Sequence, residues 1–189
     1  MKWIFLCFVL FLSACQQSPS VYKADVVNGD YDPIGEATLT EDAEGVNVKV
    51  EVVGLSPGFH GIHLHETPTC EGPTFESAGG HWSDQDKAKH GLMQTEDHHI
   101  GDMPNMEVDA SGQASYEYVV EEATLLDGSG SLFNENGGKA LIIHSGQDDG
   151  VSQPAGDSGQ RVACAEITKD KKDEETDNPA EDVSEEEKE

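Results

Sequence analysis

Alternation of apolar and polar residues is the pattern that most limits the folds open to this chain. Valine occupies every second position from Val46 to Val52, and polar residues stand between. Successive side chains on a strand point to opposite faces, so this pattern indicates a strand with one buried face. Further strand patterns cover residues 21–27, 35–40, 114–120, 139–144 and 161–167. Turn-forming clusters separate them and no long stretch has helical periodicity, which predicts an antiparallel sandwich or barrel.

A histidine-rich strand follows the turn at Pro57-Gly58. Residues 58–65 read Gly-Phe-His-Gly-Ile-His-Leu-His. His63 and His65 share one face of a regular strand, and His60 points to the other face. Two imidazoles at this spacing can bind one metal ion from the same side. A polar surface strand is the alternative, but it gives no reason for three histidines in six positions.

More potential metal ligands follow along the chain. They are His81 after Gly79-Gly80, His90 before Gly91, His99 three residues before Asp102, and His144 at the end of an apolar run. Several of them lie in residues 66–106, a long stretch of weak periodicity, and so long a loop needs a reason to be ordered. A second polar, glycine-rich loop covers residues 145–160.

The composition excludes some classes of partner. The 189 residues include 38 Asp and Glu against 11 Lys and Arg, which gives a formal net charge of −27. Such a charge repels nucleic acid and anionic lipid, so we expect no nucleic-acid partner and no electrostatic binding to membranes. Arg161 is the single arginine of the sequence.

The N-terminal residues are typical of an exported protein. Lys2 precedes an apolar run, Trp3–Leu12, that is too short to span a bilayer and fits a signal peptide. The following Leu12-Ser13-Ala14-Cys15 resembles a bacterial lipobox, so we expect residues 1–14 to be a lipoprotein signal peptide and Cys15 to carry lipid. Residues 15–20 would be the lipidated tether. An ordinary signal peptide with a coincidental cysteine is the alternative.

The C-terminal residues, 168–189, have the composition of a disordered acidic tail. From Lys169 onward there are 11 acidic residues, four lysines and almost no apolar side chains. Such a segment cannot bury enough surface to offset its ordering entropy. The folded domain is therefore expected at residues 21–167. Its two cysteines, Cys70 and Cys164, form an even pair, which favours a disulfide in an exported chain.

The ordered histidine motifs, Asp102, the two framing cysteines and Arg161 resemble the bacterial secreted copper/zinc superoxide dismutases in their lipoprotein form. The resemblance covers residues 21–167. It implies an eight-stranded antiparallel Greek-key β-barrel, related to the immunoglobulin-like sandwiches, with two long functional loops. It also implies one copper ion and one zinc ion.

The resemblance assigns each ligand by its position. Copper would be bound by His63, His65, His81 and His144. Zinc would be bound by His81, His90, His99 and Asp102, so that His81 is shared. Imidazole suits copper, and imidazole with carboxylate suits zinc. His98 competes with His99 for the zinc role, but the family motif selects His99 and leaves His98 as a solvated residue.

Further roles are also implied by the resemblance. Asp148 would hydrogen-bond His63 and His90, and its alternative is a solvated loop acid. Cys70 and Cys164 would form the family's disulfide. Arg161 would attract superoxide to the copper, and its alternative is a surface arginine paired with a carboxylate. His60 would be structural, hydrogen-bonded to the backbone.

The implied activity is dismutation of superoxide to oxygen and hydrogen peroxide, with His81 and Arg161 as catalytic residues. Superoxide is then the small-molecule partner, and the membrane is contacted through the N-terminal lipid alone. The expected location is extracytoplasmic, on the bacterial cell membrane. A copper- or zinc-binding buffer or donor without catalysis is the alternative, and the sequence leaves monomer and homodimer open.

Overall fold

The computed structural model describes residues 20–169, except residues 86, 95–96 and 135. The expected signal peptide, the lipidated Cys15 and residues 170–189 of the expected tail lie outside the described residues, so those expectations stay predictions. Thr168, the first residue of the expected tail, instead ends the last strand, where its N–H donates to Tyr22 Oη. Within the described part, no helix is long and apolar enough to cross a membrane.

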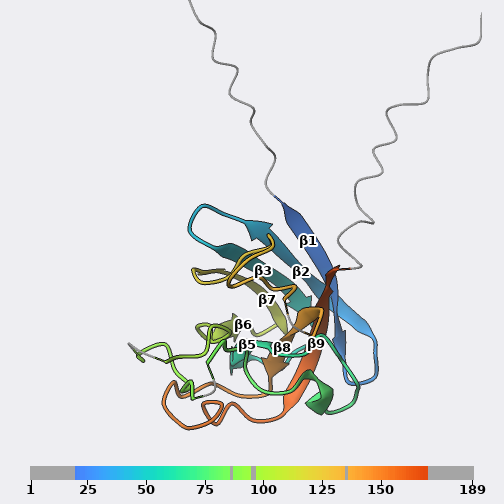
Figure 1. The fold of residues 1–189 in the computed structure, drawn as a ribbon. Coiled ribbons are helices and arrows are strands. Elements are labelled where there is room, and N and C mark those ends of the chain that lie inside the picture. The colour runs from blue at the N-terminus through green and yellow to red at the C-terminus, as the bar shows by residue number, and fades with distance from the viewer. Residues whose placement is uncertain (1–19, 86, 95–96, 135, 170–189) are drawn as a thin grey trace, which may run out of the picture.

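Antiparallel strands account for almost all regular structure in the described residues (Figure 1). One sheet has the strand order β5-β8-β9-β1-β2-β3-β7. Its strands are β1 (Val21–Asn28), β2 (Pro33–Glu41), β3 (Val46–Val53), β5 (Ile62–His65), β7 (Gln113–Val120), β8 (Gly138–His144) and β9 (Arg161–Thr168). A second sheet pairs β4 (Gly58–His60) with β6 (Met106–Val108), and β6 lies against β7. A short 3-10 helix, η1, spans Glu76–Ala78.

β4 and β5 are separated by Gly61 alone. β4 pairs with β6 and β5 pairs with β8, so this extended segment passes from one sheet to the other. Counted as one strand, it brings the nine named strands to the eight that the family resemblance implies. The expected all-β antiparallel fold is confirmed, and the curled sheet is visible in Figure 1.

The main core lies inside the curled sheet. Val46, Val48, Val50 and Val52 are all buried, as their alternation predicts, and Glu51 between them is exposed. Burying one such side chain contributes on the order of 1.5–3 kcal/mol. The repeated use of this pattern in neighbouring strands supplies the scaffold on which the loops rest.

β8 is buried on both faces, as the shorter β5 is. Leu141 and Ile143 belong to the main core, whereas Ala140 and Ile142 face a second cluster. That cluster also contains Cys70, Phe75, Ala78 and Cys164. The first loop, defined here as residues 66–105, therefore packs over the outer face of the sheet.

The predicted disulfide joins Cys70 to Cys164. It connects the start of the first loop to β9. The backbone N–H of Cys70 also donates a hydrogen bond to Glu166 Oε1 at 3.0 Å. The loop is thus held to the sheet at the point where it leaves β5.

Candidate metal centre

Four buried histidines meet on the outer face of β5 and β8. His63 and His65 project from β5 on one face, and His144 ends β8 beside them. His81 joins them because its segment pairs with β5, where the N–H of Trp82 donates to Leu64 O at 2.8 Å. One ligand atom from each of the four histidines lies within 4.8 Å of the others.

A second group shares His81 with the first. Its members are His81, His90, His99 and Asp102, and their ligand atoms also lie within 4.8 Å of one another. Asp102 Oδ1 is 2.6 Å from His81 Nδ1 and 3.4 Å from His99 Nδ1. Asp102 Oδ2 is 3.0 Å from His90 Nδ1. The structure therefore brings together both sets of residues that the sequence singles out, with His81 between them.

One nitrogen of each ring in these groups is left without a hydrogen bond. The buried side-chain atoms of the described residues that have no partner are His63 Nδ1, His65 Nε2, His81 Nε2, His90 Nδ1, His99 Nδ1 and His144 Nε2. His90 Nδ1 is close to Asp102, but the contact lacks hydrogen-bond geometry. Unpartnered buried nitrogen is unfavourable in itself. Six such atoms in two adjoining groups fit metal ligation, with imidazoles suited to copper and imidazoles with carboxylate suited to zinc.

The opposite nitrogens of several rings are fixed by oxygen acceptors. His65 Nδ1 donates to Gly79 O at 3.0 Å, and His144 Nδ1 donates to Gly159 O at 3.3 Å. His63 Nε2 donates to Asp148 Oδ2 at 2.7 Å. A carbonyl or carboxylate oxygen can only accept, so each contact fixes the proton on the outer nitrogen and directs the lone pair of the inner one to the centre.

Burial favours the neutral form of three histidines of the first group. Burial lowers the pKa of His81 to about 4, against the opposing effect of its bond to Asp102. Burial, with repulsion from His63, lowers the pKa of His144 to about 3. Burial also lowers the pKa of His65, and repulsion from His81 adds to it. Neutral imidazole is the form that binds a metal.

His90 differs because it lies between two carboxylates. Burial alone would lower its pKa, but the hydrogen bonds and charges of Asp102 and Asp148 outweigh burial and raise the pKa to about 9. Both carboxyl groups are buried, which would raise their pKa, yet their histidine partners hold each pKa well below its usual value. Without metal, this arrangement is an imidazolium between two carboxylates.

Asp148 connects the two groups. Besides His63, it accepts a hydrogen bond from His90 Nε2 at Oδ1, 2.9 Å away. The side-chain amide of Asn105 fixes its backbone, donating to Asp148 O and accepting from Asp148 N, each at 2.8 Å. Gly156 has φ +66° and stands so close that a Cβ there would collide with the Asp148 carboxylate. The position of Asp148 is thus set by both loops.

Gln153 makes two hydrogen bonds to the backbone of His90, as Asn105 does to that of Asp148. It accepts from the N–H of His90 at 2.9 Å and donates to His90 O at 3.0 Å. Residues 145–160, the second loop, therefore hold His90 through Gln153, while the first loop holds Asp148 through Asn105. The sequence analysis missed both amides, because a loop Asn or Gln carries no local signal of a distant partner.

Arg161 lies at the start of β9, opposite His144 in the strand register. Its Nη1 donates to Phe75 O and its Nη2 donates to Gly79 O, each at 2.6 Å. The guanidinium is half-buried and lines a cavity of about 510 Å³. The other described residues that line this cavity are Pro73, Thr74, Glu76, Gly159 and Gln160. Arg161 is thus held as a fixed cation at an opening beside the first histidine group.

The two remaining histidines lie outside both groups. His60 has its ring nitrogens 2.6 Å from His144 O and 2.8 Å from Ser56 O, so it links two backbone segments. His98 is partly exposed, and its Nε2 lies 2.8 Å from Glu122 Oε1. The expectation of a merely solvated His98 omits this ion pair.

Comparison with known proteins gives a consistent result. The family model described as copper/zinc superoxide dismutase matches residues 34–167. The protein named superoxide dismutase [Cu-Zn] 1 of Aquifex aeolicus is 41% identical over 168 residues, which cover 88% of this chain and 98% of the relative. The superoxide dismutase [Cu-Zn] of Caulobacter vibrioides is 37% identical over 146 residues, 76% of this chain and 83% of the relative.

Two solved structures share the fold. The crystal structure of a SOD-like protein from Bacillus subtilis matches with a TM-score of 0.72 at 34% identity, covering 77% of this chain and 97% of that one. The Cu/Zn superoxide dismutase from Brucella abortus matches with a TM-score of 0.66 at 27% identity, covering 78% of this chain and 99% of that one.

Proposed function

The chain belongs to the copper/zinc superoxide dismutase family, and we propose that it converts two superoxide anions and two protons to oxygen and hydrogen peroxide. The observation that carries this proposal is the pair of adjoining groups that share His81. Six of the seven ring nitrogens that the two metals would require have no hydrogen-bond partner, and the seventh, His81 Nδ1, faces Asp102 Oδ1. Storage of metal alone needs neither a shared imidazole nor a fixed cation beside it.

This geometry and the family pattern together support one assignment of the metal ligands. His63, His65, His81 and His144 hold copper, and His81, His90, His99 and Asp102 hold zinc. Copper, when bound there, would supply the one-electron redox chemistry that dismutation of superoxide needs. Asp148 sets the ring orientations of His63 and His90 by accepting from both.

Two residues of the chain act on the substrate. Arg161 attracts superoxide and orients it, because two of its guanidinium nitrogens are already fixed on backbone carbonyl oxygens and its charge stays at the opening. His81 holds a proton at Nε2 between the two half-reactions and gives it to the second anion. Its Nδ1, which faces the group containing Asp102, would stay bound to zinc and keep the ring in place during this exchange.

The location follows from the covalent features of the chain. The Cys70–Cys164 disulfide supports an oxidising, extracytoplasmic compartment. Residues 1–14 direct export, and lipid on Cys15 anchors the protein to the membrane through the tether 15–20. The sequence pattern supports this arrangement. Cys15→Ser should move the protein from the membrane fraction to the soluble fraction, and continued membrane association would argue against the anchor.

Pulse radiolysis of the protein with one copper and one zinc, metal content verified, tests the activity. We expect superoxide to decay with a rate constant near the diffusional ceiling of about 10⁸–10⁹ M⁻¹s⁻¹, and His81→Ala to abolish that decay. Tight binding of both metals with no decay beyond that in buffer would instead indicate a copper- and zinc-binding buffer or donor.

A further inference from the structure

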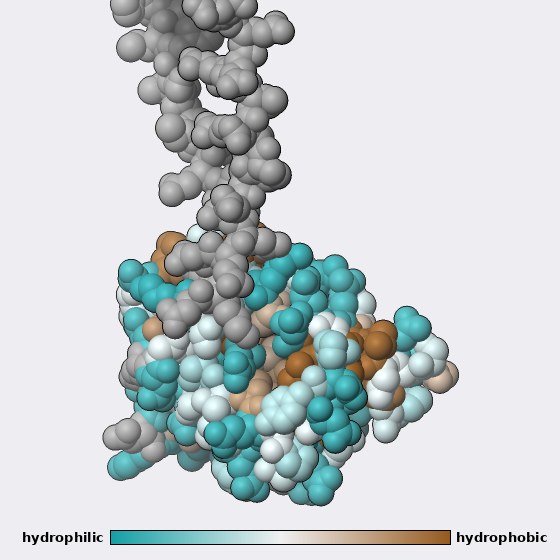
Figure 2. Space-filling model, turned by 90° about the vertical axis from the view of Figure 1, so that its right-hand side faces the viewer, coloured by the Kyte–Doolittle hydropathy of each residue, from teal (hydrophilic) through white to brown (hydrophobic). Residues whose placement is uncertain are grey.

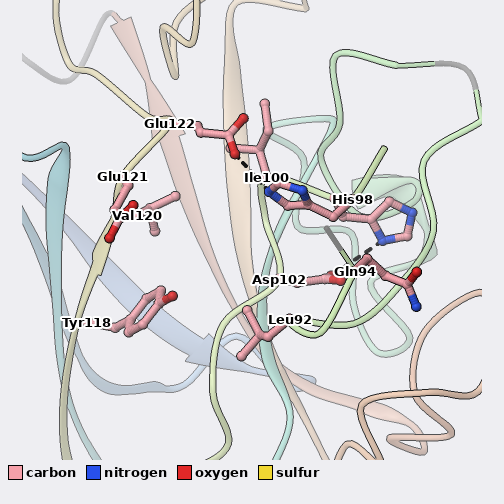
Figure 3. A pocket seen from close by; sticks show the side chains of 10 residues that line it. Leu92, Gln94, His98, Ile100, Asp102, Tyr118, Val120, Glu121 and Glu122 are labelled. Carbon is pink, nitrogen blue, oxygen red and sulfur yellow. Dashed lines mark ion pairs between the residues drawn. The ribbon is translucent and has the colours of Figure 1, made fainter. Parts of the chain in front are cut away.

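A pocket of about 230 Å³ opens on the zinc group from a different side than the Arg161 cavity. It lies between residues 92–94 and 98–102 of the first loop on one side and the end of β7 with the residues that follow on the other (Figure 3). The described residues that line it are Leu92, Gln94, His98, His99, Ile100, Asp102, Tyr118, Val120, Glu121 and Glu122. It shares no described lining residue with the Arg161 cavity.

The inner wall and the rim of this pocket have different characters. Asp102 and His99, both assigned to zinc, line it, and Asp102 is almost fully buried. Glu121 and Glu122 are exposed, and Figure 3 shows Glu122 directed at His98. Among the described lining residues none is a lysine or an arginine. The rim of the pocket, defined here as His98, Glu121 and Glu122, therefore attracts cations, whereas the Arg161 cavity attracts anions.

Two of the zinc ligands, His90 and Asp102, are too enclosed for an ion to reach them directly from bulk solvent. The side chains of His90 and Asp102 are 1% and 2% exposed, and the unpartnered nitrogens of His90 and His99 are buried. A hydrated divalent ion must first lose water and meet protein ligands near the surface. The pocket has room for several water molecules at about 30 Å³ each, so a partly hydrated ion fits.

We propose that this pocket is the route by which zinc enters and leaves, with Glu121, Glu122 and His98 as its first, transient ligands. The inference rests on the proposed zinc assignment. His98 Nε2 and Glu122 Oε1, 2.8 Å apart, are neighbouring atoms of the two types that zinc binds as ligands. From them the ion passes inward to Asp102 and His99, which line the same pocket.

A route has a kinetic signature that a binding site lacks. The path into the site is also the path out of it, so an obstacle in the pocket slows entry and release by the same factor. The equilibrium affinity for zinc then stays unchanged. A general loss of stability would instead speed release and weaken binding.

Leu92 and Met93 are a matched pair of positions at which a bulky side chain can be introduced. Leu92 lines the pocket and Met93, its neighbour, is exposed and outside the lining. Entry is followed by the visible absorption of Co(II) added to zinc-depleted protein, and release by zinc leaving the loaded protein into excess chelator. We expect Leu92→Trp to slow both processes equally and Met93→Trp to slow neither. Equal rates in the two variants would overturn the route.

The role of the rim is tested with a second pair. Glu121→Gln with Glu122→Gln removes two charges at the pocket, and Glu71→Gln with Glu107→Gln removes two exposed charges elsewhere. We expect the first pair to slow Co(II) entry by about tenfold and the control pair to change it little. Equal slowing in both pairs would overturn the role of the rim as ligands. Failure of the unaltered protein to bind zinc would overturn the zinc assignment itself.

Discussion

At the scale of single residues, Asp148 is the acceptor that orients one ring of each metal group. We expect Asp148→Asn to weaken zinc binding by about 10–100-fold. An amide can accept from one histidine N–H but presents its own N–H₂ to the other, leaving a donor unsatisfied. Zinc competition against a chelator measures the change. Asp149→Asn removes the same charge one position away, and an equal effect there would contradict this role.

Gln153 supports the same centre from the backbone of His90. Gln153→Met keeps the length of the side chain but loses both hydrogen bonds, worth about 1 kcal/mol each. We expect zinc affinity to fall and the amide hydrogen of His90 to exchange faster. Gln113→Met, at an exposed position on β7, is the control. A slow His90 amide in the Gln153 variant would show that other contacts hold this backbone.

His90 also sets how zinc binding depends on pH. In the zinc-free protein its pKa is raised to about 9, so its contribution to stability is present below pH about 6.5 and is lost as the pH rises through 9. At pH 7 zinc must displace the Nδ1 proton. We therefore expect calorimetry in buffers of different ionisation enthalpy to show release of about one proton, with affinity increasing up to pH 9. Binding without proton release at pH 7 would contradict this.

At the scale of elements, strands and loops differ in what the sequence reveals. β3 and β7 could be predicted because alternation is local, and the ligands because each stands in a short motif. The ordered conformation of the two loops depends on contacts between residues that are far apart in the sequence, such as Asn105 with Asp148 and Gln153 with His90. Nothing near those residues in the sequence indicates the partner. For the same reason, the sequence does not reveal that the chain passes from one sheet to the other at Gly61.

The disulfide links the first loop to β9, so its loss should affect both stability and Arg161. For a loop of 94 residues the chain-entropy estimate is about 4–5 kcal/mol of stability. Phe75 and Gly79, which hold Arg161, follow Cys70 closely. We expect Cys70→Ala with Cys164→Ala to lower the unfolding free energy by about that amount and to weaken azide binding to the loaded protein. Azide binding at the native level would show that Arg161 is held independently of the disulfide.

At the scale of the whole molecule, the fixed Arg161 cation works within a strongly acidic protein. The formal net charge is −27, and hydrophilic residues cover much of the face shown in Figure 2. The second loop has no lysine and carries Asp148, Asp149 and Asp157. Superoxide is an anion, so at long range the molecule repels it, and Arg161 acts at the opening.

Salt distinguishes these two effects, because it screens distant charges more than close ones, with a Debye length of about 10 Å at 0.1 M. We expect the dismutation rate constant to stay unchanged or rise slightly as ionic strength increases. Pulse radiolysis across a salt series measures this, with Arg161→Gln as the comparison. In this variant we expect a lower rate constant and a clearer increase with salt, because only the repulsion of superoxide by the acidic surface remains. A steep fall in the unaltered protein would mean that the attraction of Arg161 outweighs the acidic surface even at long range.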